Sequence, residues 1–424
     1  MPINIIKSVT VTIYFLIIGS ILASPQIEWE KTIGSTLNEY AYSVQQTRDE
    51  GFIIAGYTGP HDSEGYDAWF VKADANGIEV WNKRYGGILY DCAYSVIETY
   101  DGGYIFTGET DPNEGTLSEV FLVKTDSDGN ILWNNAFGGI EMDKGKSVLQ
   151  ASDGGYIILG DTRSFGAGNW DIWLIKTDAN GKMLWSRTFG SSQADHGYSL
   201  RQTSDKGYII CGTSLSDINN KDLFLIKTDA GGNELWSRTF GGERIDEGSY
   251  AEETRDGGYI LAGHTVIPGN LFDVLLIKTN TLGEEIWRRV FGGTGMDMVF
   301  SMEETTDGGY ILAGEKADTL WSDANAYLVK CDAEGNEIWH IIFGGSSSDY
   351  FWSVQQTSDR GYVAVGGTNS YGLGGSDLYI VKLAADCVIP PVSDLTGDCK
   401  VDIKDFARMA AEWLFCGHAD PNDC

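Results

Sequence analysis

The chain has 424 residues, 42% of them hydrophobic, and a formal net charge of −31. So acidic a balance argues against nucleic acid or an anionic membrane as a partner, because phosphate groups are bound by clustered Lys and Arg. The length could hold two or three ordinary domains, but an array of internal repeats would use it differently.

Residues 1–23 predict a secretory signal peptide. A single positive charge at Lys7 precedes an apolar run from Val9 to Leu22, and Ile21 and Ala23 stand just before Ser24. The run is short for a membrane span, and polar sequence follows at once. We therefore expect a secreted, extracellular protein without a membrane span after cleavage. The alternative is an uncleaved anchor with the same topology.

A module of strand, tight turn and strand recurs along the chain. In the copy at residues 171–190, alternating apolar residues run into Asp178-Ala-Asn-Gly181 and resume beyond it. One Trp and one Lys of the module each recur seven times, 51 or 52 residues apart. The two series are Trp29, Trp81, Trp133, Trp185, Trp236, Trp287 and Trp339, and Lys72, Lys124, Lys176, Lys227, Lys278, Lys330 and Lys382.

This period predicts an all-β fold, a seven-bladed β-propeller over residues 24–386, with four strands in each blade. Residues 27–34 match only the second half of the module, and residues 377–384 match only the first half. We therefore expect the N-terminal strand to complete the last blade and close the ring, which leaves no gap with unpaired strand edges.

Blade 4 illustrates the four predicted strands, A to D from the axis outward: 197–203, 207–213, 222–229 and 233–240. Turns such as Asp153-Gly154-Gly155 join strands A and B, because Gly tolerates the positive φ that such turns need.

The segment Asp178-Ala-Asn-Gly-Lys-Met-Leu-Trp185 resembles the tryptophan-docking repeat of quinoprotein-like propellers, with one residue fewer between Asp and Trp. The resemblance implies that each Trp packs between neighbouring blades, and the large apolar area of the indole supports this role. It implies little about function, since that superfamily includes both dehydrogenases and non-catalytic scaffolds.

A carboxylate opens strand A of every repeat. Together these acids could form a ring at the rim of the central channel that binds a cation such as Ca²⁺. The simpler interpretation is that each binds the backbone of its own Gly-Gly turn, because it recurs in every blade. The series is Glu39, Asp91, Asp143, Asp195, Asp246, Asp297 and Asp349.

The loops between strands B and C share no common sequence, and in a propeller they should surround one mouth of the channel. Function belongs on such loops when a rigid scaffold holds them. Their aromatic and imidazole groups suit stacking on sugar rings or gripping a protein loop, unless each merely packs its own loop. The predicted ligand-binding residues are His61, Tyr66, Phe165, Trp170, Phe272, Trp321 and Tyr371.

The cysteines fall into two groups. Cys92, Cys211 and Cys331 stand at repeat positions that other blades fill with various residues, so we expect small packed side chains. The other four follow residue 386 and, in an exported chain, suggest two disulfides in a small C-terminal unit, with a pairing that the sequence does not determine. These are Cys387, Cys399, Cys416 and Cys424.

After a linker at 387–393, residues 394–424 predict a calcium-binding module. Oxygen donors follow the spacing of an EF-hand loop, and a helix with one apolar face is expected over 406–415. The predicted Ca²⁺ ligands are Asp394, Thr396, Asp398, Lys400 through its carbonyl, Asp402 and Asp405. A non-metal interpretation would make these acids solvated turn residues.

This loop and helix look like one half of a dockerin, a module that plugs secreted proteins into cohesin-bearing assemblies. Two departures weaken the match: Cys399 replaces the usual Gly at position 6, and no second loop is present. The resemblance implies Ca²⁺ as the cofactor and a cohesin-like or cell-surface protein as the partner.

Three functions compete. The first is a non-catalytic binding or scaffold propeller for a glycan or a protein, attached through its tail. The second is a polysaccharide-degrading enzyme, an endoglucanase-like glycoside hydrolase that uses two carboxylates. The third, a quinoprotein dehydrogenase, is disfavoured because no adjacent cysteine pair and no set of metal and quinone ligands is present. The sequence favours the first.

Overall fold

The computed structural model describes residues 24–60, 65–87, 89–111, 117–217, 220–267, 271–319, 322–386 and 406–409. Ser24–Ala385 form one compact unit, and the helical turn at 406–409 belongs to a second. The predicted signal peptide, the linker, the four C-terminal cysteines and all six predicted Ca²⁺ ligands lie outside the described residues.

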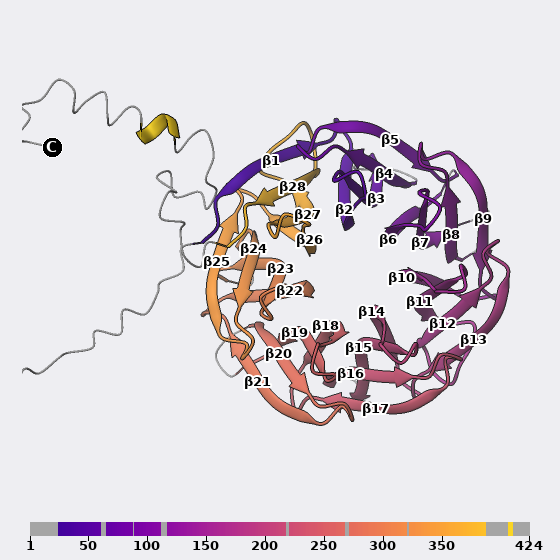
Figure 1. Ribbon diagram of the computed structural model, residues 1–424. Coiled ribbons are helices and arrows are strands. Elements are labelled where there is room, and N and C mark those ends of the chain that lie inside the picture. Colours follow the sequence, from indigo (N-terminus) through magenta and orange to yellow (C-terminus); the bar gives the residue numbers. More distant parts are fainter. Residues whose placement is uncertain are drawn as a thin grey trace, which may run out of the picture. The chain divides into compact units, whose positions relative to one another are not determined.

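Seven four-stranded antiparallel sheets surround a central axis, as Figure 1 shows, so the predicted seven-bladed propeller is confirmed. In each blade the strands follow from the axis outward. Blade 1 consists of β2 (Asn38–Gln46), β3 (Phe52–Gly59), β4 (Asp67–Ala73) and β5 (Glu79–Tyr85), and blade 2 of β6 (Asp91–Glu98), β7 (Tyr104–Thr110), β8 (Glu119–Thr125) and β9 (Ile131–Phe137). Blade 3 consists of β10 (Asp143–Gln150), β11 (Tyr156–Thr162), β12 (Asp171–Thr177) and β13 (Met183–Phe189), and blade 4 of β14 (Asp195–Gln202), β15 (Tyr208–Asp217), β16 (Asn220–Thr228) and β17 (Glu234–Phe240).

Blades 5 to 7 repeat the same arrangement. Blade 5 consists of β18 (Asp246–Glu253), β19 (Tyr259–Thr265), β20 (Asp273–Thr279) and β21 (Glu285–Phe291). Blade 6 consists of β22 (Met296–Glu304), β23 (Tyr310–Ala317), β24 (Asn325–Cys331) and β25 (Glu337–Phe343). Blade 7 consists of β26 (Asp349–Gln356), β27 (Tyr362–Thr368), β28 (Asp377–Leu383) and β1 (Ile27–Ile33).

The ring closes as the half-modules predict. β1 pairs antiparallel with β28, and Trp29 stands opposite Lys382 in the register. In Figure 1 the indigo N-terminal strand therefore forms the outer edge of the orange last blade. Strands from the two ends of the propeller thus share one sheet.

The predicted strands of blade 4 are recovered with shifted ends. The main difference is the B-to-C loop expected at 214–221, where β15 and β16 continue to pair through Ser214 with Asp222 and Leu215 with Lys221. In this blade the predicted loop is therefore mostly a hairpin extension.

The Trp series packs between blades, as predicted. The ring of Trp133, in β9, lies against Gly181 in the outer turn of the next blade, where an added Cβ would approach it to 2.5 Å. It also lies 5.8 Å from Tyr156, which opens β11 of that blade. The same contact joins Trp29 with Gly77, Trp81 with Gly129, Trp185 with Gly232, Trp236 with Gly283 and Trp287 with Gly335.

The Lys series is structural as well. In blade 6, Lys330 is 0% exposed, and its Nζ lies 2.9 Å from the carboxylate of Asp307 in the A-to-B turn. Burial acts to raise the pKa of Asp307, but hydrogen bonds from Thr305, the Gly309 amide and Lys330 hold it below its usual value. Each blade repeats this pair, which ties strand C to the turn between A and B.

The carboxylates that open strand A are buried within their blades and do not share a common cation site. Asp143, for example, accepts hydrogen bonds from the Gly139 amide at 2.9 Å and from the Ser164 hydroxyl at 2.7 Å. The simpler interpretation is therefore right that each carboxylate binds backbone of its own blade, but wrong about the turn, which is the one that precedes strand A. It is not the Asp-Gly-Gly turn that follows this strand.

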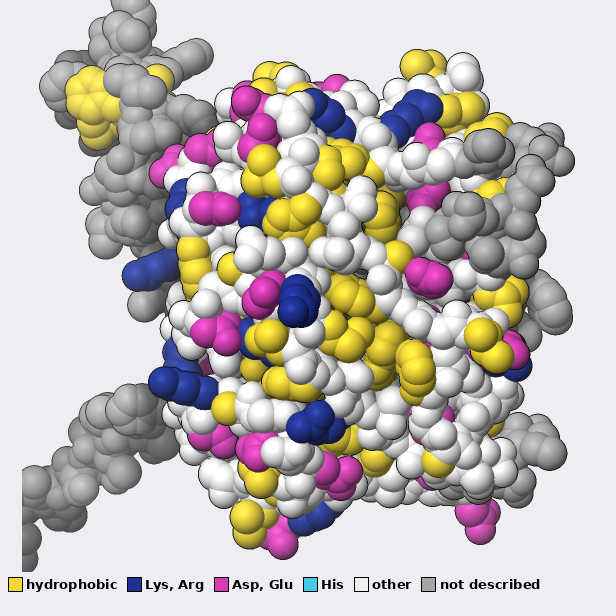
Figure 2. Space-filling view, turned by 90° about the vertical axis from the view of Figure 1, so that its right-hand side faces the viewer, with side chains coloured by type: hydrophobic (Ala, Val, Ile, Leu, Met, Phe, Trp, Pro, Cys, Tyr) yellow, Lys and Arg dark blue, Asp and Glu magenta, His cyan; other side chains and the backbone are white. Residues whose placement is uncertain are grey.

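The outer strands expose an apolar residue directly before the docking Trp in several blades, as in Val80, Leu132, Leu184, Leu235 and Ile286. Figure 2 shows the side of the ring that carries β9 and β13, where hydrophobic side chains gather between charged ones. Cys92, Cys211 and Cys331 are buried and unpaired, as expected of packed residues.

Candidate functional site: an aromatic cavity in the central channel

The innermost strand of every blade carries a β-bulge at the same position. In β6 the register steps from Ala93 opposite Gly108 to Ser95 opposite Thr107, which leaves Tyr94 unpaired. Bulges re-aim a side chain and are frequent next to functional sites. The seven bulge residues, each three positions after the carboxylate that opens strand A, are Tyr42, Tyr94, Lys146, Tyr198, Ser249, Phe300 and Trp352.

A glycine in strand B permits each bulge. A Cβ added to Gly108 would lie 1.7 Å from the carbonyl oxygen of Cys92, and the equivalent glycine of every other blade meets the same obstacle. Only a residue without a side chain fits opposite the bulge. The glycines recur because the backbone needs them, while the residues that they allow to point at the axis differ from blade to blade.

All seven bulge residues line one cavity of about 490 Å³ on the axis. Five of them are aromatic, and Glu247 and His264 of blade 5 complete the wall. Phe300 stacks on Trp352 with ring centroids 4.2 Å apart, and Tyr42 lies 5.5 Å from Trp352. The cavity therefore has an aromatic side at blades 6, 7 and 1, while Lys146 of blade 3 and Glu247 of blade 5 are its charged groups.

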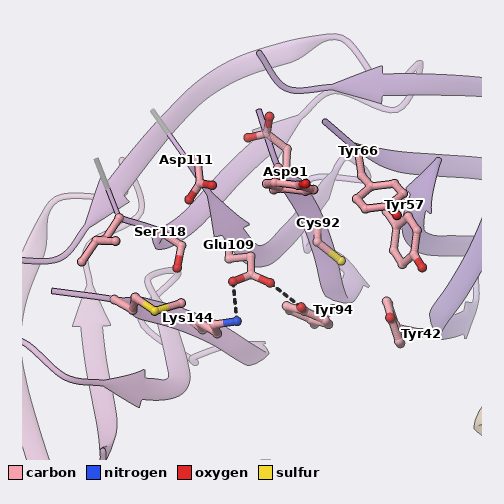
Figure 3. A pocket seen from close by; sticks show the side chains of 13 residues that line it. Tyr42, Tyr57, Tyr66, Asp91, Cys92, Tyr94, Glu109, Asp111, Ser118 and Lys144 are labelled. Carbon is pink, nitrogen blue, oxygen red and sulfur yellow. Dashed lines mark hydrogen bonds and ion pairs between the residues drawn. The ribbon is translucent and has the colours of Figure 1, made fainter. Parts of the chain in front are cut away.

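A second cavity of about 390 Å³ shares Tyr42 and Tyr94 with the first and extends toward the B-to-C loops. Figure 3 shows Tyr57 and Tyr66 on one side of it and Glu109 with Lys144 on the other. The two cavities therefore adjoin at these two side chains.

The polar groups that line the second cavity form a connected network. Glu109 accepts a hydrogen bond from Tyr94 Oη at 2.5 Å and pairs with Lys144 Nζ at 2.8 Å. Burial acts to raise the pKa of Glu109, but Lys144, Tyr94 and more weakly Lys146 hold it below its usual value. Burial, followed by Cys92 and Glu109, raises the pKa of Tyr94, so its phenol stays protonated and donates.

Two buried nitrogens in the cavity wall have no hydrogen-bond partner among the described residues. They are Nδ1 of His264 and Nε1 of Trp352. Burial lowers the pKa of His264 against the opposing effect of Glu247, so its imidazole is neutral near pH 7. Unpaired buried polar groups are uncommon in folded proteins, and each calls for an explanation such as a ligand or a water molecule.

The other end of the channel holds a further cavity of about 420 Å³, and several side chains that line it also join neighbouring blades. Ser43 Oγ accepts a hydrogen bond from the Val96 amide at 3.3 Å, and Gln45 Oε1 accepts one from the Glu98 amide at 2.5 Å. Related contacts recur around the ring. These side chains thus take part in joining the blades, and Glu252 and Glu303, whose pKa values burial raises to about 7, line the same cavity.

Of the predicted ligand-binding residues, Tyr66 lines the second cavity and packs against Tyr57 at 4.7 Å. Trp170 and Phe272 do not line either cavity. The ring centroid of Trp170 lies 5.8 Å from that of His196, and the ring centroid of Phe272 lies 5.2 Å from that of His264.

Two further predicted residues, Phe165 and Tyr371, do not line either cavity. Phe165 and Tyr371 are 44% and 45% exposed, and the Tyr371 hydroxyl donates to the Gly344 carbonyl. His61 and Trp321 lie outside the described residues. The five described residues thus do not line one common cavity.

The bulge residues lie in the innermost strands and are not among the loop residues that the sequence predicts as ligand-binding. A signal for them exists in the sequence. Six of the seven repeats have a Ser four residues after the opening carboxylate, and the bulge residue comes directly before this position. It is aromatic in five repeats, Lys in one and Ser in one. A variable position inside an otherwise repeated strand is where a repeat scaffold can place function.

Among the described residues, no group of three or more His, Cys, Asp and Glu side chains could hold a metal ion. The predicted calcium loop at 394–405 lies outside that part of the chain. Within the same described ranges, none of the helical structure is long and apolar enough to cross a membrane.

The fold and the channel define a seven-bladed β-propeller with an aromatic axial cavity. No protein-family model and no curated protein matches the chain. Solved structures resemble it at low identity. One is a protein of unknown function from Dyadobacter fermentans, with a TM-score of 0.51 and 11% identity, covering 85% of this chain and 99% of the other.

Two enzymes show a similar likeness. A puromycin hydrolase mutant complexed with PGG has a TM-score of 0.53 and 13% identity, covering 82% of this chain and 52% of the other. A fungal alcohol oxidase in complex with copper has a TM-score of 0.51 and 11% identity, covering 88% and 79%. At such identities the likeness shows the fold alone.

Proposed function

We propose that the chain is a secreted, non-catalytic carbohydrate-binding propeller whose ligand enters the axial channel from the loop face. One observation carries this proposal: the seven bulges bring five aromatic rings together around a single cavity. Aromatic rings provide platforms for the apolar faces of sugar rings, and the polar groups beside them provide hydrogen bonds.

The size of the site favours a small ligand over a protein surface. A cavity of about 490 Å³ lies within the usual range for small-molecule sites, whereas protein interfaces are broad and comparatively flat. Tyr198 remains 39% exposed, and Tyr42, Tyr94, Phe300 and Trp352 are partly exposed, so parts of these rings are accessible.

A second candidate, glycoside hydrolysis, is favoured by one specific observation. Glu109 and Asp111 line the same cavity, and their pKa values move in opposite directions. Burial, followed by Glu109 and Asp91, raises the pKa of Asp111, whereas the pKa of Glu109 is lowered. Such a difference is found in acid and base pairs. We rank this candidate second because Glu109 is already bonded to Lys144 and Tyr94.

Affinity electrophoresis through gels that contain soluble polysaccharides tests the proposal. The wild-type protein is expected to be retarded by at least one polysaccharide, and Trp352→Ala is expected to abolish the retardation because it removes one face of the cavity. Tyr371→Ala, a loop aromatic outside the cavities, is expected to migrate like the wild type.

Retardation lost in Tyr371→Ala but kept in Trp352→Ala would instead place the ligand on the loops. New reducing ends in the polysaccharide, lost in Glu109→Gln and Asp111→Asn, would establish the hydrolase in place of the binding protein.

We also propose that the C-terminal tail binds Ca²⁺ and attaches the molecule to an extracellular assembly or surface through a cohesin-like or cell-surface protein. The ligand spacing in residues 394–405 supports this. Calorimetric titration of the full chain with Ca²⁺ is expected to show one site that is lost in Asp398→Ala. It should be kept in Asp420→Ala, which alters an acid outside the loop. No heat of binding in the wild type would contradict the proposal.

A further inference from the structure

Lys146 is the one cation among the seven bulge residues that line the axial cavity. Its Nζ lies 4.2 Å from the centroid of the Tyr94 ring. No ion pair joins this ammonium to a carboxylate within the described residues. The ring therefore holds the charge in place without neutralising it.

The other charged groups around the cavity have direct partners. Lys144 pairs with Glu109 at 2.8 Å, and Lys221 pairs with Glu247 at 2.8 Å. Asp161 accepts from the Gly197 amide at 2.8 Å and lies 2.9 Å from Nδ1 of His196. Lys146 is therefore a positive charge with no direct counter-ion, although Glu109 lies within its electrostatic reach.

We propose that the channel binds acidic sugars, and that Lys146 pairs with the carboxylate of a uronate. This inference rests on the carbohydrate-binding function proposed above and names the class of glycan. The sugar ring lies against the aromatic side of the cavity, and its carboxylate faces blade 3.

A cationic ligand fits this cavity less well, even though five aromatic rings could surround an ammonium group. The cation of Lys146 already lies over Tyr94, and a second cation would be repelled. Glu247, an acid of the cavity wall, is paired with Lys221, so it offers little uncompensated negative charge. The charges that line this cavity thus favour an anion despite the net charge of −31 on the whole chain.

Two forms of one ligand test the inference. Trigalacturonate and its fully methyl-esterified form share the same rings and differ in charge, and each is titrated calorimetrically into the full-length protein. The wild type is expected to bind the free acid at least about tenfold more tightly, the effect of one charge-assisted hydrogen bond. Lys146→Met should lose this preference, and Lys146→Arg should keep it.

Lys182→Met serves as the matched control, because it removes an exposed lysine from the outer turn of the same blade. Binding of both forms with equal affinity, or a preference that survives in Lys146→Met, would overturn the acidic-sugar inference and leave the carbohydrate-binding proposal standing. If neither form binds and no polysaccharide retards the protein, both proposals fail. Circular dichroism of each variant confirms that the fold is retained.

Discussion

Deletion of residues 24–34, which include β1, is expected to abolish the stable closed ring. β1 supplies the outer strand of blade 7 and places Trp29 against Gly77 of blade 1. It also brings Glu30 to the Tyr379 hydroxyl at 2.6 Å and Glu28 to Lys382 at 3.3 Å. The loss of one packed Trp alone costs about 3–5 kcal/mol, a large share of a typical folding free energy.

The exposed edge of β28 adds a second consequence, because an unpaired strand edge is a template for pairing with another chain. Size-exclusion chromatography should therefore show aggregated or unfolded protein, and thermal unfolding followed by circular dichroism should show no transition near that of the wild type. A chain truncated after Asp386 is the control, because it keeps every propeller strand. A deletion variant that remains monomeric with an unchanged melting temperature would show that closure by β1 is unimportant.

Trp339→Ala is expected to lower the free energy of unfolding by about 3–5 kcal/mol, the usual cost of removing a buried aromatic ring. Trp339 is 6% exposed, belongs to the core shared by blades 6 and 7, and lies 6.0 Å from Tyr362 of blade 7. The substitution leaves a cavity between two blades that the surrounding sheets cannot fill by a small movement.

Urea unfolding measured by intrinsic fluorescence and circular dichroism checks this value. Leu184→Ala is the control, since Leu184 is 56% exposed beside Trp185, and surface changes of this kind usually lie within about 0.5 kcal/mol. Equal effects of the two substitutions would mean that the Trp series does not join the blades.

The repeated Trp and Lys residues make different contacts, although both recur for the same reason. Trp joins each blade to the next, whereas Lys and Asp tie a strand to a turn within the same blade. Both recur because every blade repeats the same local environment. The carboxylates that open strand A follow the same logic, which is why they do not combine into one ion site.

Periodicity in the sequence alone determined the number of blades, the order of strands within them, and the closure by β1. These features are repeated seven times, so a regular spacing of Trp, Lys and turn residues is sufficient to identify them. The burial of Cys211 and Cys331 could also be predicted from the sequence, because each replaces a residue of a repeated strand. The extended hairpin of blade 4 could not be predicted in this way, since its pairing depends on a few residues in a single loop.

Only the tertiary structure decided where a ligand could bind. Tyr42, Tyr198 and Trp352 come from blades 1, 4 and 7. The repeat marks them as equivalent positions, but only the structure shows that their side chains converge on one cavity. The bulge that turns each of them inward follows from a backbone register and a glycine on the neighbouring strand. A repeat reveals what the blades have in common, while the chemistry of the channel depends on how they differ and on the ring that brings those differences together.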